Sequence, residues 1–461
     1  MIGGENLNIK KIKRLIENDM ERKKSILEAK EYYKNNTDIK KKGVVPQNKE
    51  SKDPLRNADN RISHNFHELL VDEKVSYMFT YPVIFDIDDD KDLNNKLMGV
   101  LDESFRRKSK ALATEAANCG TAWLHYWIKD NKDFKYEMVD TEQIIPIYSN
   151  SLERELTAVI RYYTILEEQD EGSMEDKAFL IVEYWTNTGM IKYKFNDSSI
   201  IGEPTPEGIT HSLGEVPFIE FANNEKKQSD LSRYKSLIDL YERVMSGFAN
   251  DLEDIQQIIY ILEDYGGENL GEFLGELKRY KTVKTESNPN GGSSGGLKTL
   301  QIEIPVEARK VVLDVLKKQI YESGQGLQQD IESFGNASGV ALKFFYRKLE
   351  LKAGLMETEF REGFNRLAKA ILKFLKVDAK KIQQTYTRNM ISNDLENAQI
   401  AQISVGTIPG KFILNNHPWV DDVEEAERLL EEERKDEYED LINSKNNNDI
   451  NLTKKKGLEN E

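Results

Sequence analysis

Cysteine and long apolar runs are almost absent from this chain of 461 residues. The single cysteine, Cys119, excludes an intrachain disulfide and a cysteine-based metal cluster, and it indicates a protein made for a reducing compartment. No stretch reaches the roughly 18 consecutive apolar residues of a membrane span. The N-terminal stretch has no apolar core of the kind that secretory signals carry, since it reads MIGGENLNIKKIKRLIENDMERKK. The sequence therefore predicts no membrane partner and no secretion.

Positive charge is in deficit, because 65 Lys and Arg face 81 Asp and Glu and give a net charge of −16. Hydrophobic residues make up 38% and charged residues 32% of the chain, whereas soluble proteins average roughly 45–50% and 25%. Such a polar chain indicates an elongated shape or a core completed by other copies. The acidic total argues against wrapping DNA on a broad basic face, but it allows loose contact along a narrow surface.

Candidate metal ligands are few. The chain has 5 histidines, and only His64 and His67 share a helical spacing, which we interpret as an exposed helix face. A zinc-protease helix requires a second histidine four residues after the first, but the fourth residue after His67 is not histidine. Asp86 begins an Asp-x-Asp-x-Asp run, but Lys91 and Leu97 stand where a calcium loop needs Gly and Glu. The sequence predicts no metal site and no cofactor.

The glycine-rich segment GGSSGGLKT is the one candidate for nucleotide chemistry. A phosphate-binding P-loop needs its Lys directly after the last Gly, but Leu297 precedes Lys298 here and no long helix follows. The same segment also spells G-x-S-x-G, yet a nucleophile elbow needs a strand-to-helix turn with His and acid partners. We interpret it as a hairpin loop, predict no catalytic residue and conclude that the protein is not an enzyme.

Hydrophobic periodicity predicts a mixed chain up to about residue 221. Apolar residues at steps of three and four predict helices over 9–33, 60–81 and 91–117. Runs of β-branched and aromatic residues, separated by turn residues, predict strands at VIFDI, TAWLHYWI, VIRYYTI, AFLIVEYWT, MIKYKF and VPFIEF. The fold class predicted for this region is α+β, with an antiparallel sheet.

The pattern becomes helical after residue 230. Apolar positions from Leu237 to Leu262 predict one helix over 230–265, roughly 45 Å long at ~1.5 Å per residue. A small insert over 268–304 then separates it from a second helix, which begins with Pro305. A third helix follows over about 340–375. Beyond it we expect the strand IQQTYTRN, a helix over about 393–405, and a last helix in VDDVEEAERLLEEERKDEYEDL.

Several motifs resemble a known family, the portal proteins of tailed bacteriophages, in the branch typical of phages of Gram-positive hosts. The resemblance covers about residues 60–433. It rests on NRISHNFHELLVDEKVSYMFTYP, NCGTAWLHYW, IIPIY, GEVPFIEFANNEKKQSDL, FGNASGVALKF, TRNMISND and GTIPGKFILNNHPWVDDVEEAERLLEEE. The most specific of these is FGNASGVALKF, which is similar to the family's tunnel loop and the start of its kinked helix.

The resemblance implies a portal fold, with an α+β wing, two long stem helices, a small α/β clip, a long kinked helix and a helical crown. By position these regions are an N-terminal helical arm (1–59), wing (60–228), first stem helix (229–267), clip (268–304), second stem helix (305–325), tunnel loop (326–338), linking helix (339–375), crown (376–442) and disordered tail (443–461).

The resemblance also implies a function and partners. The protein would form a homo-oligomeric ring, usually of twelve subunits, at one capsid vertex, and double-stranded DNA would pass through it during packaging and ejection. It would assemble in the host cytoplasm and end in the virion. The implied partners are the terminase large subunit, which docks at the clip, a head-tail adaptor protein, and the major capsid and scaffolding proteins.

The implied site residues fall into three groups. The tunnel loop in the DNA channel would contain Ser333, Phe334, Gly335, Asn336, Ala337, Ser338 and Gly339. Lys343 and Arg347, four residues apart on the next helix, would supply a weak positive ring, or would pair only with acids of a neighbouring subunit. Terminase docking at the clip would use Asn288, Asn290, Gly292, Ser293, Ser294 and Lys298.

Two other functions are consistent with a helical, oligomeric chain. A scaffold or tail component would never meet DNA, and it would have no reason for a Gly/Asn/Ser loop between two long helices. An ATP-driven DNA motor would need the P-loop that the glycine-rich segment fails to provide.

Overall fold

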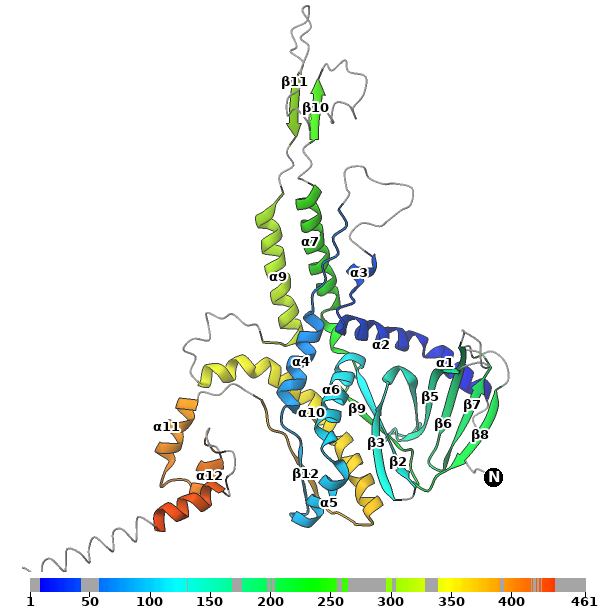
Figure 1. Cartoon of the computed structure of the whole chain (residues 1–461), viewed down its shortest axis with the longest axis vertical. Coiled ribbons are helices and arrows are strands. Elements are labelled where there is room, and N and C mark those ends of the chain that lie inside the picture. The colour runs from blue at the N-terminus through cyan, green and yellow to red at the C-terminus, as the bar shows by residue number, and fades with distance from the viewer. Residues whose placement is uncertain are drawn as a thin grey trace, which may run out of the picture. The chain divides into compact units, whose positions relative to one another are not determined.

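A computed structural model describes residues 9–42, 58–130, 132–167, 176–196, 200, 204–254, 259–263, 296–300, 304–327, 339–389, 394–415, 417, 420, 423 and 425–435. The chain forms two compact units (Figure 1). The first contains residues 1–328 and 348–389, and the second contains 329–347 and 390–461. Helices and antiparallel strands occur together, which confirms the α+β class. None of the helices in the described ranges could span a membrane.

Two antiparallel sheets lie in the first unit, with strand orders β4-β5-β6-β7-β8 and β3-β2-β9. Their strands are β2 (Thr121–Lys129), β3 (Asp133–Val139), β4 (Ile144–Tyr148), β5 (Leu156–Glu167), β6 (Lys177–Trp185), β7 (Gly189–Phe195), β8 (Thr205–Thr210) and β9 (Phe218–Ala222). The strands expected at β2, β5, β6, β7 and β9 are confirmed. The sequence gives no sign of β8, because every residue of this edge strand is exposed and no alternation marks it.

The N-terminal helices are α1 (Ile9–Asn18), α2 (Met20–Tyr33) and α3 (Asp38–Lys42). Ile12 and Ile16 on α1 are buried against the larger sheet, together with residues such as Ile160 and Val182. Helix α1 therefore covers one face of that sheet and supplies part of its core. In the basic run 40–42, Lys42 pairs with Asp38 and Lys41 with Glu31.

Helices α4 (Phe66–Phe79), α5 (Lys91–Leu101) and α6 (Ser104–Cys119) follow, with strand β1 (Ile84–Ile87) between α4 and α5. The prediction of a helix from residue 60 is wrong for residues 60–65, which are not helical. The prediction of one helix over 91–117 is also wrong, because Asp102 adopts a φ of 54° and ends α5. Strand β1 pairs with β12 (Ile382–Thr385), the expected strand in IQQTYTRN.

Helices α7 (Lys235–Asp254) and α9 (Val306–Gly324) run side by side (Figure 1). Leu237 and Tyr241 of α7 pack with Leu313 and Leu316 of α9. The predicted helix over 230–265 is too long, because Ile259–Glu263 forms strand β10, which pairs antiparallel with β11 (Gly296–Leu300). The segment IYILE has apolar residues that fit helical spacing, yet its β-branched and aromatic residues favour a strand. The expected strand YKTVKT lies outside the described residues.

Helix α10 (Gly339–Leu375) confirms the third predicted helix and is the longest element. Its residues Phe360 and Phe364 are fully buried. They pack edge-on or tilted against rings from other elements, including Phe79 of α4 and Phe221 of β9, with centroids 5.0–6.4 Å apart. This aromatic cluster holds α10 against α4 and β9 of the first unit.

The second unit contains α11 (Asp394–Ser404), which confirms the predicted helix there, and α12 (Gly410–Asn415). The segment TIPG lies between them, and a bridge joins Val405 to Ile408. Residues 425–435 are helical, within the predicted last helix. Several apolar side chains of this unit are exposed, among them Ile403 at 80% and Phe412 at 63%.

Candidate functional site

Most of the predicted site residues lie outside the part of the chain that the structure describes. This is true of Ser333, Phe334, Gly335, Asn336, Ala337 and Ser338 in the expected tunnel loop, and of Asn288, Asn290, Gly292, Ser293 and Ser294 in the expected clip. The described exceptions are Gly339, Arg347 and the backbone positions of Lys343 and Lys298. The predicted docking and DNA roles of all these residues remain predictions.

The described exceptions lie in regular elements. Gly339 begins α10, and Lys343 and Arg347 lie four residues apart on that helix. The Arg347 side chain is exposed, whereas the side chain of Lys343 lies outside the described residues. Lys298 lies in strand β11, opposite Ile261 of β10. A P-loop lysine begins a helix, so the position of Lys298 in a strand agrees with the interpretation of its segment as part of a hairpin.

The N-terminal side of the expected tunnel loop is fixed to α4. The backbone N–H of Leu327 donates to both carboxylate oxygens of Glu73, at 3.1 and 3.0 Å. A Cβ on Gly326 would lie 2.3 Å from a methyl group of Leu70, so a larger residue here would require the Leu70 side chain to shift. Burial raises the pKa of the Glu73 carboxyl, while Leu327 and Lys352 oppose that shift. The start of the loop is therefore held by one specific acceptor.

A buried row of polar side chains on α7 binds the segment that precedes α4. Glu242, Ser246 and Asn250 lie four residues apart and are 0%, 0% and 7% exposed; we call them the acceptor ladder. They accept hydrogen bonds from the backbone N–H groups of His64 (2.8 Å), Ile62 (2.9 Å) and Asn60 (2.6 Å), respectively.

The acceptor ladder works because two spacings agree. Four helical residues rise ~6 Å, and two residues of an extended chain rise ~6.6 Å. Every second N–H of the segment therefore meets one ladder acceptor, which explains why residues 60–64 are extended rather than helical. Thr37 donates to the other carboxylate oxygen of Glu242 at 2.5 Å, so the N-terminal helices are tied to α7 as well.

A buried charge cluster joins α4, the short 3-10 helix Asp230–Arg233 that precedes α7, and α10. Lys74 and Lys352 both approach Asp230 Oδ2, at 2.6 and 3.1 Å. Asn223 accepts from Lys74 at 2.7 Å and donates to Asp230 Oδ1 at 2.9 Å. Lys352 also donates to the carbonyl oxygen of Gly324, the last residue of α9, at 2.8 Å. We call Lys74, Asn223, Asp230 and Lys352 the charge junction.

The charge junction contains two cations and one anion, and its three charged side chains are at most 2% exposed. Burial lowers the pKa of Lys74 to about 8. The nearby cation Lys352 lowers this pKa further, whereas the carboxylate of Asp230 raises it. Burial alone would raise the pKa of Asp230, but the two lysines hold it well below its usual range. Removal of the one anion would leave two buried cations without compensation.

The histidine and aspartate motifs have structural roles in the described residues. The interpretation of His67 as part of an exposed face is wrong, because His67 is 1% exposed and its Nδ1 lies 2.7 Å from the Tyr234 hydroxyl. Asp90 caps α5, and Asp88 accepts from the backbone N–H groups of Lys380 and Lys381 at 2.9 and 2.7 Å. In the described part of the chain, no three His, Cys, Asp or Glu side chains gather in a way that could hold a metal.

Neither the ladder nor the junction emerges from sequence periodicity. Some of the residues involved nevertheless lie inside motifs already quoted. Lys74 and Asn60, which donates to the ladder, lie in NRISHNFHELLVDEKVSYMFTYP, and Asn223 and Asp230 lie in GEVPFIEFANNEKKQSDL. Charged residues inside otherwise apolar segments were the available signal, because a charge there must be paired if it is buried.

The sequence matches the family described as "Phage portal protein, SPP1 Gp6-like" over residues 12–439. It is 64% identical to the portal protein of Clostridium phage phiCD119 over 452 residues. This alignment covers 96% of this chain and 99% of the relative. It is 29% identical to the portal protein of Bacillus phage SPP1 over 391 residues. This alignment covers 82% of this chain and 76% of the relative.

Proposed function

The chain belongs to the SPP1 Gp6-like family of phage portal proteins, and from this premise we propose how its parts serve a DNA conduit. Its function is that of the family: a portal through which the phage genome is packaged. The match over residues 12–439 carries this conclusion. Portal proteins are structural components of the virion that sit at a capsid vertex as homo-oligomeric rings and associate with the capsid and the terminase.

The ring of this protein has twelve subunits, and the paired helices α7 and α9 form its stem. The exposed faces of these helices support this assignment. Val311 and Val315 lie four residues apart on α9 and are 59% and 54% exposed, and Leu252 on α7 is 49% exposed. Apolar side chains of this kind gain stability when a neighbouring copy covers them, at about 25 cal/mol per Å² of apolar surface.

The hairpin of β10 and β11 lies between the two stem helices in the chain, as a clip does, and it docks the terminase large subunit and later the head-tail adaptor. The residues 288–296 lead into β11 in the sequence. Deletion of 288–296 should leave rings intact and weaken terminase binding, as measured by co-sedimentation with purified rings. If the deleted protein binds terminase as the intact protein does, this segment is only a spacer.

The residues 326–338 form the tunnel loop that meets DNA in the channel, and the crown and tail follow α10. The anchoring of Leu327 on Glu73 supports a loop that starts from a fixed point. Asn336 and Ser338 would offer hydrogen bonds to phosphates without fixed charge, and Lys343 and Arg347 a weak positive ring. Subunits assemble in the host cytoplasm with the major capsid and scaffolding proteins, without a cofactor or catalytic residue.

The decisive experiment is electron microscopy of the purified protein, followed by packaging in vitro with terminase and procapsids. We expect rings with a central hole and DNA packaging that depends on them. Replacement of Asn336 and Ser338 by tryptophan should spare the rings and slow packaging, whereas replacement of the exposed Ser76 by tryptophan should affect neither. If rings with both loop residues replaced package DNA at the normal rate, the assignment of residues 326–338 as the tunnel loop is wrong.

A further inference from the structure

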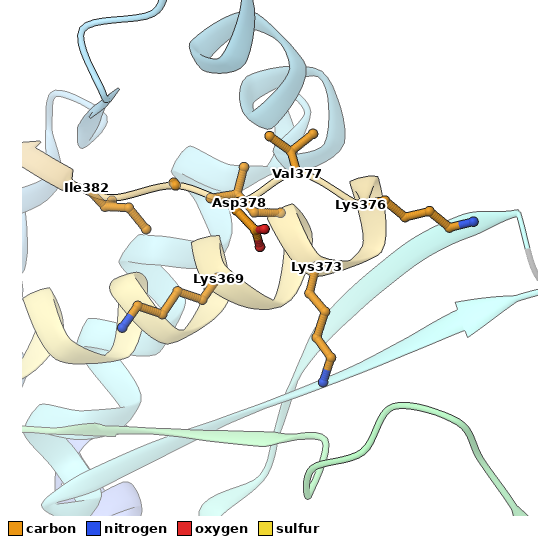
Figure 2. A pocket seen from close by; sticks show the side chains of 8 residues that line it. Lys369, Lys373, Lys376, Val377, Asp378 and Ile382 are labelled. Atoms are coloured by element: carbon orange, nitrogen blue, oxygen red, sulfur yellow. The ribbon is translucent and has the colours of Figure 1, made fainter.

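A hollow of about 470 Å³ lies at the C-terminal end of α10, in the first unit (Figure 2). Four apolar residues line it, Leu372, Val377, Ala379 and Ile382, and we call them its floor. Three lysines, Lys369, Lys373 and Lys376, line it from the helix, together with one acid, Asp378. We call this site the lysine hollow. Over residues 369–381 the chain carries five lysines and one aspartate, although its net charge is −16.

The three lysines of the hollow differ in the contacts that they make within the described residues. Lys373 donates to the carbonyl oxygen of Leu213 at 2.6 Å and lies 4.0 Å from a carboxylate oxygen of Glu215. Lys369 and Lys376 are exposed, and neither makes an ion pair with any residue that the structure describes. The side chains of Lys369 and Lys376 point in opposite directions (Figure 2), so two ammonium groups on either side of the hollow have their charge available to a partner.

Lys376 occupies a position where the backbone favours glycine. Its φ is 57°, and it ends α10 in a Schellman motif, because Val377 N–H donates to Leu372 O at 3.0 Å and Lys376 N–H to Lys373 O at 3.1 Å. A non-glycine residue in this conformation is strained. Glycine would relieve that strain, so the lysine side chain has a use that helix termination does not explain.

We propose that the lysine hollow is a docking site for an acidic protein segment whose apolar side chain enters the floor while flanking carboxylates meet Lys369 and Lys376. The charge of the hollow is complementary to carboxylates, and its floor is complementary to an aliphatic or aromatic side chain. Lysines bind as point charges on flexible stems, so they adapt to carboxylates at varied positions. The proposal does not depend on the passage of DNA through the ring.

The apolar floor distinguishes this partner from DNA. A duplex presents phosphates and sugars on its outside, and neither would fill a floor of leucine, valine and isoleucine side chains. DNA binding would use the lysine rim alone and would be independent of any apolar group in the ligand. A test of the floor therefore separates the two classes of partner.

The test measures binding of a fluorescein-labelled peptide, two leucines flanked on each side by four glutamates, to the full-length protein by fluorescence anisotropy at low salt. Lys369→Gln and Lys376→Gly should each weaken binding about three-fold, the size expected of an exposed ion pair, and the double variant about ten-fold. Lys376→Gly should unfold at the same or a higher temperature than the unchanged protein, which separates lost binding from lost folding. The matched control is Lys348→Gln, an exposed lysine elsewhere on α10, which should change nothing.

A second peptide, with serines in place of the leucines, tests the floor and should bind several-fold more weakly. Equal affinity for both peptides would overturn the proposal, because charge alone would then explain binding. It would also be overturned if Lys376→Gly and Lys348→Gln had equal effects. Binding of a duplex oligonucleotide that falls as steeply in the double variant as peptide binding does would assign the rim to DNA instead.

Discussion

The larger sheet and the charge junction are both buried, yet opposite kinds of side chain fill them. Under the sheet, α1 and the strands pack aliphatic and aromatic residues such as Ile12, Ile160 and Val182. At the junction, Lys74, Asp230 and Lys352 meet with at most 2% of each side chain exposed. Apolar packing tolerates small shifts, whereas a buried ion set is stable only in one arrangement of its partners. The core under the larger sheet gains stability from the apolar area that it buries, and the junction fixes the positions of α4, α7, α9 and α10.

The largest effect should follow from Asp230→Asn, which removes the one anion of the junction. Two buried ammonium groups would then lack compensation, and the free energy of unfolding should fall by about 3–5 kcal/mol. Urea unfolding monitored by tryptophan fluorescence gives this value. Adding Lys74→Met to the variant should recover part of the loss, because it removes one of the stranded cations. A loss below about 1 kcal/mol would mean that water reaches the junction.

Truncation of Ile12 to alanine tests the apolar side of the comparison. Ile12 is 0% exposed, and loss of a buried isoleucine costs about 3 kcal/mol through lost burial and the cavity left behind. The control is Lys11→Ala on the exposed face of the same helix, which should cost almost nothing. If both variants unfold at the same urea concentration, α1 does not belong to the cooperative core.

Acidification should affect the charge junction and the smaller sheet through one histidine in each. Burial lowers the pKa of His67 near the junction and of His125 in β2 to about 4. Unfolded histidine has a pKa of about 6.5, so only the unfolded chain takes up protons between those values, and stability falls as the pH drops through that window. Each histidine should cost about 2 kcal/mol between pH 7 and pH 5.

The matching measurement is urea unfolding at both pH values. His125→Phe should reduce the pH-dependent loss by roughly half of the two-histidine effect. An unchanged pH dependence in this variant would show that His125 is already protonated in the fold.

The smallest effect should come from the acceptor ladder. Ser246→Ala leaves the backbone N–H of Ile62 buried without its acceptor, and this should cost about 1–2 kcal/mol. Ser76→Ala, on the exposed face of α4, is the control and should leave the unfolding temperature unchanged. Exposure of residues 60–64 can be followed by hydrogen exchange, which should accelerate at Ile62 before it does elsewhere; uniform acceleration would argue against a local role.

The same comparison explains what could be predicted from the sequence. Apolar alternation and helical spacing predicted β5, β6, β7 and α10, because those elements bury one face against a core whose pattern is local. The extended segment 60–65 and strand β10 were missed for a different reason. Ile62 is extended because Ser246 accepts its N–H from a helix 184 residues away, and Ile259 is in a strand because Leu300 pairs with it.

The candidate site shows the same limit. The motif around Lys74 resembled the family's sequence. The role of Lys74 itself depends on Asp230 and Lys352, which are distant in the sequence and adjacent only in the folded chain. Left-handed backbone at Lys376 was equally unpredictable, because lysine rarely adopts it. Charges that fold together from distant segments carry no local signal.

The sharing of Asp230 between two lysines also has a consequence for synthesis. Lys74 leaves the ribosome first, Asp230 later, and Lys352 only after most of the chain has been made. A nascent chain that ends before residue 352 lacks both the second cation and the donor for the Gly324 carbonyl that ends α9. The junction therefore closes only after residue 352 has been made, and a product terminated before it would leave the Gly324 carbonyl at the end of α9 without this donor. An assembly in which one defective copy would spoil a whole ring thus has, in each subunit, a test against chains truncated before residue 352.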